Sequence, residues 1–172
     1  MGKLLFHGTI YDFSVPDLNY CKDKKDFGKG FYLAEDLNHA KSIANKSFLI
    51  SRYAEYKYIY SYRIDVSELR ESNLNVHEFR EANIAWLDYI MKNRMKINDD
   101  DDYDVVIGPT ADAEAQCLVM KFYHEHGLNA TNNQKASFIQ KLKPCIYGRQ
   151  YCFKTDKSLE YLNNHFVERR TI

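Results

Sequence analysis

The chain has 172 residues, with 24 basic and 24 acidic side chains, so its formal net charge is zero. A chain of this length folds as one domain, and we predict a single domain over residues 1–172. A balanced charge carries no electrostatic footprint for nucleic acid, so a nucleic-acid partner would have to bind to a local patch.

The four cysteines, Cys21, Cys117, Cys145 and Cys152, are too scattered for a zinc site or a disulfide framework. We therefore expect no metal and a reducing compartment. The apolar run in residues 1–6 is too short for a signal peptide, and no run has the length of a membrane span. Together these patterns predict a cytoplasmic protein with no membrane partner.

Apolar runs and alternation predict three strands in the first part of the chain, at residues 3–7, 31–34 and 56–66. A loop with one short helical turn at residues 17–20 separates the first two strands. Asp36 is a suitable N-cap for a helix whose apolar residues recur at spacings of three and four. This part of the chain is therefore predicted to run strand, loop, strand, helix, strand.

Helical periodicity dominates the second part of the chain. The acidic run at residues 98–102 lacks the ligand spacing of a calcium loop and is predicted to be a solvated loop. Strands and helices are mixed without strict alternation, which indicates the α+β class rather than a doubly wound parallel sheet. The predicted helices are 81–95, 113–126, 133–142 and a short one capped by Thr155 or Asp156, and the predicted strands are 103–109, broken at Gly108-Pro109, 150–153 and 166–168.

Residues 26–34, which read DFGKGFYLA, are the most distinctive stretch of the sequence. Gly28 and Gly30 have no Cβ, so a ligand could lie close to the backbone where the next strand begins. Tyr32 would present a flat aromatic face beside that space, and such a face favours a cationic ring. The alternative interpretation is a tight turn that leads into a core strand.

Two further motifs accompany this stretch. The first predicted strand ends in His7-Gly8-Thr9, and a late strand carries the sequence QYCF at residues 150–153. In this order the three motifs resemble those of the ADP-ribosyltransferase superfamily, and they are closest to the branch with a His-Tyr-Glu signature, the diphtheria-toxin-like and poly(ADP-ribose) polymerase enzymes. The segment 103–112 and the overall length further resemble a group of small bacterial proteins in that superfamily.

The resemblance implies a single ADP-ribosyltransferase-like domain, a split pair of packed antiparallel sheets with flanking helices and a cleft that binds nicotinamide adenine dinucleotide (NAD) as a co-substrate. His7 would bind the adenosine ribose, the Gly8 backbone would pair with the nicotinamide carboxamide, and Thr9 could add its hydroxyl. Tyr32 would stack on the nicotinamide ring. The cofactor-binding residues that the resemblance implies are His7, Gly8, Thr9, Gly30, Phe31 and Tyr32.

Gln150 stands where the active members of the superfamily have a glutamate. The glutamate holds the 2′-hydroxyl of the nicotinamide ribose and stabilises the positive charge that develops as the glycosidic bond breaks. Glutamine keeps the hydrogen bonding but loses the charge, which implies a lower rate and impaired chain elongation without abolishing single-unit transfer. On this basis Gln150→Glu is expected to raise activity. Gly148 replaces the second glutamate of arginine-directed relatives, which disfavours arginine modification.

A catalytic base would have to come from another carboxylate. Asp112 ranks first because it follows a predicted central strand at a Gly-Pro break, and Glu114 and Asp26 are the alternatives. The catalytic residues expected from the resemblance and from this ranking are therefore His7, Tyr32, Gln150 and Asp112.

The function predicted in this way is transfer of a single ADP-ribose from NAD to a protein or nucleic-acid acceptor, as a bacterial toxin or regulator. Two alternatives remain open. One is an NAD glycohydrolase, in which water is the acceptor, and the other is a catalytically silent module of the same fold that binds NAD or a partner protein. An antitoxin or a regulatory protein is the further partner that such a toxin would have.

Overall fold

The computed structural model describes residues 2–97, 101–111 and 113–172, and within them the chain has a mixed α+β fold with one seven-stranded sheet and six α-helices. The predicted α+β class is therefore confirmed. The strands are β1 Lys3–Thr9, β2 Phe31–Ala34, β3 Tyr58–Ile64, β4 Val76–Glu78, β5 Val105–Ala111, β6 Ile146–Phe153 and β7 Phe166–Thr171. They lie in the order β4-β5-β6-β2-β1-β3-β7. Among the described residues, β4 and β5 form the parallel pair of this sheet.

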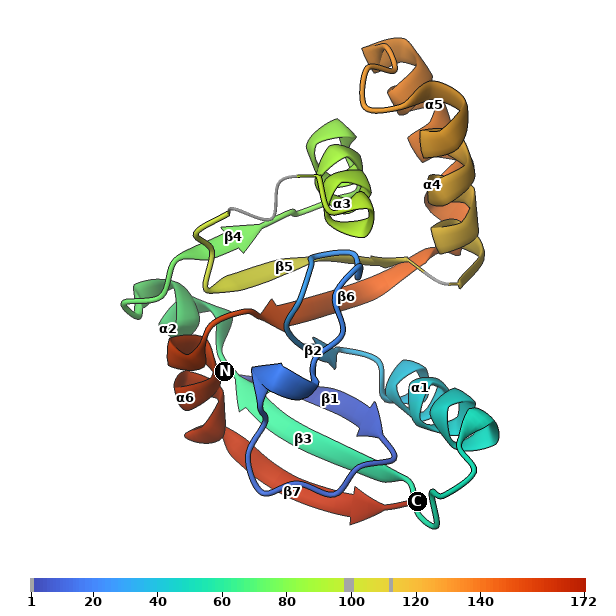
Figure 1. The fold of residues 1–172 in the computed structure, drawn as a ribbon. Coiled ribbons are helices and arrows are strands. Elements are labelled where there is room, and N and C mark those ends of the chain that lie inside the picture. Colours follow the sequence, from blue (N-terminus) through green and yellow to red (C-terminus); the bar gives the residue numbers. More distant parts are fainter. Residues whose placement is uncertain (1, 98–100, 112) are drawn as a thin grey trace.

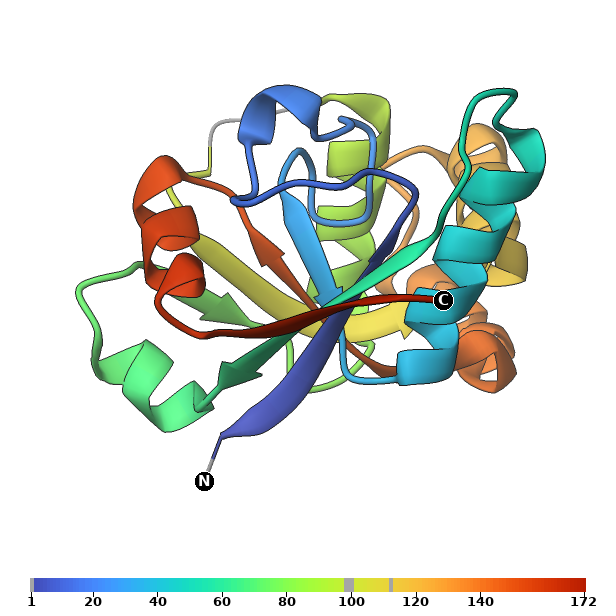
Figure 2. The same cartoon turned by 90° about the horizontal axis from the view of Figure 1, so that it is seen from below.

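Two groups of strands make up the sheet, and they meet between β1 and β2. Across the described residues these two strands share one paired position, Phe6 with Ala34, whereas β1 pairs with β3 along its whole length. The group β4, β5, β6 and β2 lies above the group β1, β3 and β7 in Figure 1. Seen from below in Figure 2, blue β1 and yellow β5 run in different directions. The pairing between the groups therefore ends just before His7.

The helices flank the sheet on several sides. Figure 1 shows α3, α4 and α5 beside the upper group of strands, α1 beside β1, and α2 and α6 at the opposite end. Side chains cap them as the sequence predicts, since Asp36 accepts a hydrogen bond from the backbone of Asn38 at 2.8 Å. The helices are α1 Leu37–Ile50, α2 Val66–Glu71, α3 Ile84–Met95, α4 Ala113–His126, α5 Asn132–Leu142 and α6 Asp156–Asn163.

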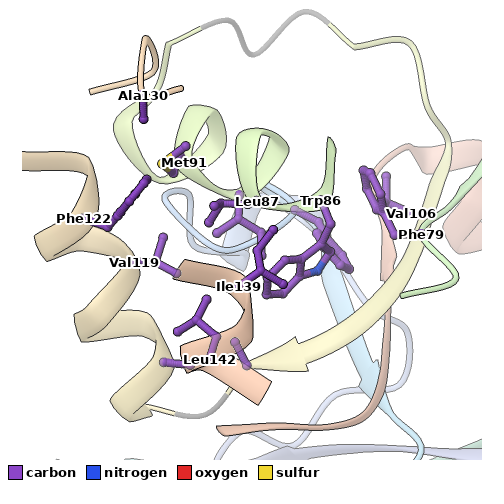
Figure 3. Packing of buried hydrophobic residues seen from close by; sticks show 14 of the residues in the cluster. Phe79, Trp86, Leu87, Met91, Val106, Val119, Phe122, Ala130, Ile139 and Leu142 are labelled. Carbon is purple, nitrogen blue, oxygen red and sulfur yellow. The ribbon is translucent and has the colours of Figure 1, made fainter. Parts of the chain in front are cut away.

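One hydrophobic cluster packs α3, α4 and α5 against β5 and β6 (Figure 3). Trp86 and Leu87 of α3 are fully buried in it, and they meet Val119 and Phe122 of α4 and Ile139 of α5. Because each helix contributes residues at helical spacing, the apolar stripes predicted from periodicity are the surfaces that are buried here. The cluster fixes the position of α3, whose last turn reaches the candidate site.

A second cluster joins the two groups of strands. Leu5 and Tyr62 from the lower group pack with Leu33 and Tyr151 from the upper group, and Leu162 of α6 closes the cluster. All five side chains are 1 % exposed or less. The two groups therefore share a core although their backbones pair at one position in the described chain.

The structure differs from the prediction at several elements. α2 and β4 were not predicted, and β5 continues to Ala111 beyond the predicted break at Gly108-Pro109. β6 begins at Ile146 rather than at residue 150, and β7 ends at Thr171 rather than at residue 168. Gly108 lies inside the strand, and Phe27 packs directly on it. A Cβ at this position would come within 2.8 Å of Phe27 Cζ, which explains why the residue is a glycine. The glycine therefore serves close packing and does not end the strand.

Residues 98–100 of the acidic run lie outside the described residues. Asp101 is half-buried, and its carboxylate lies 2.7 Å from the ammonium of Lys154 and accepts a hydrogen bond from Tyr89. This part of the run is thus anchored to the fold. None of the helices in the described ranges combines the length and the apolar content that crossing a bilayer requires.

Candidate functional site

The three motif residues lie on three adjacent strands at the centre of the sheet. His7 is on β1, Tyr32 on β2 and Gln150 on β6, and these strands are neighbours in the order β6-β2-β1. Tyr32 is paired with Cys152, and Ala34 is paired with Gln150. Because side chains alternate along a strand, Tyr32 and Gln150 lie on the same face of the sheet.

The phenol of Tyr32 holds the glycine-rich loop that precedes β2. Its hydroxyl donates to the carbonyl of Gly28 at 2.7 Å and accepts from the backbone N–H of Phe27 at 3.0 Å. Burial raises the pKa of Tyr32 well above its usual range, so the phenol is neutral at physiological pH. The ring is half-buried, and these two bonds fix its direction.

Close contacts with neighbouring protein atoms explain why the two motifs contain glycines. A Cβ at Gly8 would lie 1.8 Å from the carbonyl oxygen of Ala40 in α1, one at Gly30 would lie 2.4 Å from Cys152 Sγ, and one at Gly28 would lie 2.6 Å from Asn93 Oδ1. Gly28 also has a φ of +82°, which disfavours other residues. The sequence interpretation assigned the missing Cβ atoms to a ligand, whereas in the structure neighbouring segments of the protein use this space.

His7 lies where the two groups of strands separate. Its Nδ1 is 2.8 Å from the carbonyl oxygen of Tyr32, its ring stacks on Phe31 with centroids 4.2 Å apart, and the edge of Phe13 lies against it at 6.0 Å. Burial lowers the pKa of His7 to about 4. The neutral imidazole therefore donates from Nδ1 to Tyr32, which leaves Nε2 as an acceptor.

The ring of His7 packs with the aromatic side chains of the second cluster, while Tyr32 packs against the first. The structure thus brings Tyr32 and Gln150 to one face of the sheet, whereas the side chain of His7 lies on the other face and bonds to the backbone carbonyl of Tyr32. Thr9 is buried, and its hydroxyl accepts a hydrogen bond from the backbone of Tyr11 at 3.1 Å.

The amide of Gln150 has a fixed orientation. Its Nε2 lies 3.0 Å from Asp26 Oδ2 and 3.4 Å from the carbonyl oxygen of Pro109, and the residue is 9 % exposed. Both neighbours are acceptors, so the nitrogen faces them and Oε1 faces away. Within the described parts of the chain, no group donates a hydrogen bond to Oε1. This oxygen can therefore accept a hydrogen bond from a ligand.

Of the three carboxylates considered as a base, Asp26 is the one bonded to Gln150. Asp112, ranked first from the sequence, lies outside the described residues, and Glu114 is exposed in the first turn of α4. Arg94 was not identified from the sequence, although it forms an ion pair with Asp26 at 2.5 Å. No sequence signal connects these residues, because they are 68 positions apart.

A surface hollow of about 520 Å³ lies next to the aromatic rings around His7. It is lined by Asp12, Phe13, Ser14, Phe166 and Arg169, so it does not include the three motif residues. Phe13 separates the hollow from His7. Among the described residues, no group of histidine, cysteine and carboxylate side chains is arranged to hold a metal ion.

A family model described as "Protein of unknown function (DUF3990)" matches residues 3–164, and the chain belongs to this family. The match includes all three motifs and almost the whole sheet. No curated protein and no solved structure matches the chain.

Proposed function

We propose that the protein is a mono-ADP-ribosyltransferase that uses NAD as its co-substrate and has an ADP-ribosyltransferase-like arrangement of two strand groups around a cleft. The observation that carries the proposal is the placement of His7, Tyr32 and Gln150 on adjacent central strands, where the two groups of strands separate. These residues come from distant parts of the chain, and the motif resemblance assigns all three to one ligand.

Each residue offers a contact that suits this ligand. The neutral His7 offers Nε2 as an acceptor for a ribose hydroxyl, and the aromatic face of Tyr32 favours the pyridinium ring. Oε1 of Gln150 can accept a hydrogen bond from the 2′-hydroxyl of the nicotinamide ribose. The resemblance adds the backbone of Gly8 and Gly30 and the side chains of Thr9 and Phe31. The ranking of the carboxylates in the sequence adds Asp112 as a base.

In the proposed reaction the bond between the nicotinamide nitrogen and the ribose C1′ breaks, and its electron pair leaves with nicotinamide. A nucleophile of the acceptor forms the new bond to C1′ and loses its proton to a base. Because Gln150 is uncharged, it gives the cationic ribose less stabilisation than a glutamate would, which favours transfer of a single unit over chain elongation. The acceptor is a protein or a nucleic acid of the cytoplasm, and an antitoxin or regulatory protein would control the activity.

Incubation of the purified protein with NAD labelled in its adenylate phosphate tests the proposal. Label on a macromolecule supports transfer, and sensitivity of that label to protease or to nuclease identifies the acceptor class. Free labelled ADP-ribose supports the glycohydrolase instead, and binding without turnover supports the silent module, which the neutral amide of Gln150 also suits. Tyr32→Ala should abolish the signal, while Tyr53→Ala, on a tyrosine that is 91 % exposed, serves as the matched control.

A further inference from the structure

Asp26 is a buried carboxylate whose two oxygens have different partners. Its side chain is 5 % exposed, and Oδ1 lies 2.7 Å from Nε and 2.5 Å from Nη2 of Arg94, whose side chain is 13 % exposed. Oδ2 accepts the hydrogen bond from Gln150 at 3.0 Å. A buried carboxylate needs a cation and hydrogen-bond donors to compensate its charge, and Arg94 with Gln150 provides both.

This network extends to the glycine-rich loop. Asp26 opens the loop that Tyr32 holds at Phe27 and Gly28, and Arg94 belongs to the last turn of α3, which the hydrophobic cluster anchors. Asp26 is therefore fixed from two sides before it meets Gln150. A rigid carboxylate can determine the direction of the amide, whereas a mobile carboxylate would move together with the amide.

The same geometry disfavours a glutamate at position 150. In the same rotamer its carboxylate would face Asp26 Oδ2 and the carbonyl of Pro109, so that only acceptors would meet. Two carboxylates in contact cannot both be ionised, and one of them would have to take up a proton. Glutamine avoids this conflict because its Nε2 donates to both acceptors.

We propose that Asp26, held by Arg94, is a positioning residue that directs Oε1 of Gln150 towards NAD, and that this pair requires glutamine rather than glutamate at position 150. The ligand and the reaction in this statement rest on the proposed function. The proposal reverses the expectation drawn from the sequence, namely that Gln150→Glu raises activity. The negative charge next to position 150 is already present, on Asp26.

Exchange of the carboxylate and the amide between positions 26 and 150 tests the proposal. Asp26→Asn and Gln150→Glu as single variants should each lower kcat for NAD cleavage by about 10- to 100-fold with a smaller change in KM. In the double variant, the new asparagine can donate to the new glutamate and accept from Arg94, so the cluster keeps one carboxylate. Its kcat should return to within about threefold of the wild type or exceed it, since the two changes are coupled.

Thermal unfolding gives a readout that needs no activity. Gln150→Glu should lower Tm by about 5 °C or more at about pH 8, and the loss should diminish in acid, where the two carboxylates can share a proton. The double variant should lack this pH dependence. Gln140→Glu, at an exposed position of α5, is the matched control and should behave as the wild type.

The outcomes separate the two proposals. If the wild type cleaves NAD and Gln150→Glu is equally active or more active with an unchanged Tm, the positioning role of Asp26 is overturned while the proposed function stands. If the wild type neither binds nor cleaves NAD, the proposed function fails and the positioning of Oε1 towards NAD fails with it. The unfolding data then still decide whether Asp26 and position 150 are coupled.

Discussion

Nδ1 of His7 lies 2.8 Å from the carbonyl oxygen of Tyr32, so a side chain of β1 bonds to β2 just beyond the one backbone pair that these strands share in the described chain. A continued ladder would satisfy that carbonyl with a backbone N–H. Here the imidazole takes this place, and the two groups of strands separate next to it. The histidine therefore forms a structural hydrogen bond and is also a candidate contact for the ligand.

Protonation of His7 should destabilise the fold. Burial lowers the pKa of His7 from 6.5 to about 4, so between these values the unfolded chain binds more protons at this site than the folded chain. The contribution to stability is fully present above pH 6.5 and is lost as the pH falls towards 4, by up to about 3 kcal/mol. Urea unfolding of wild type and His7→Gln between about pH 4 and pH 7 measures it. His124→Gln, at an exposed site on α4, should retain the wild-type pH dependence.

Removal of the ring of Phe13 should expose His7. Phe13 stacks on Tyr60 with centroids 4.0 Å apart and meets the edge of His7, and it lines the adjacent hollow. In Phe13→Ala, water should reach the imidazole and raise the pKa of His7 from about 4 towards its ordinary value. An NMR titration of the imidazole checks this. Phe166→Ala, which changes the same hollow away from His7, should leave the pKa of His7 low, and an unchanged titration in Phe13→Ala would contradict the burial argument.

Gly8→Ala should be among the most damaging small substitutions. The new Cβ would lie 1.8 Å from the backbone oxygen of Ala40, and a backbone atom of a packed helix cannot move as a side chain does. We expect a loss of about 3 kcal/mol in the free energy of unfolding. Gly148→Ala is the control, because its Cβ would meet no atom of the described residues within 4 Å, and its φ of +56° is what opposes alanine there. That variant should lose about 1 kcal/mol. Equal losses of unfolding free energy in the two variants would show that α1 does not pack closely against Gly8.

The hydroxyl of Tyr32 should matter separately from its ring. Tyr32→Phe keeps the aromatic face but leaves the N–H of Phe27 and the carbonyl of Gly28 without this partner, which should cost about 1–3 kcal/mol of stability. With a looser loop, KM for NAD should rise more than kcat falls. Tyr53→Phe should change neither quantity, since Tyr53 is 91 % exposed. An unchanged stability of Tyr32→Phe would mean that the phenol does not hold the loop.

Local patterns in the sequence predict much of the fold. The N-cap Asp36 and the glycine after α4, with a φ of +65°, mark helix ends that the structure confirms. The error at Gly108-Pro109 has a physical cause. β4 ends at Glu78 opposite Ile107, so beyond that point the described part of β5 pairs with β6 alone. A proline is tolerated where one side of a strand carries no ladder.

The candidate site could be predicted only in part. His7 and Tyr32 belong to contiguous motifs, whereas Asp26 and Gln150 are 124 positions apart, and no spacing rule connects them. Arg94 looks like an ordinary cation in the last turn of a helix, where its positive charge interacts favourably with the helix dipole. Its pairing with Asp26 follows from how α3 packs, which is a tertiary property. The same holds for the glycines, whose missing Cβ atoms are explained by neighbouring segments that the sequence does not reveal.

Addition of NAD to isotopically labelled protein, followed by NMR, tests most directly whether the three motifs form one NAD site. The backbone amide signals of Gly8, Gly30 and Tyr32 and the side-chain amide signal of Gln150 should shift together as one binding event. Tyr32→Ala should weaken the binding, while Tyr53→Ala should not. Signals that stay unchanged at saturating NAD, or that shift only around the hollow lined by Phe166 and Arg169, would contradict this prediction.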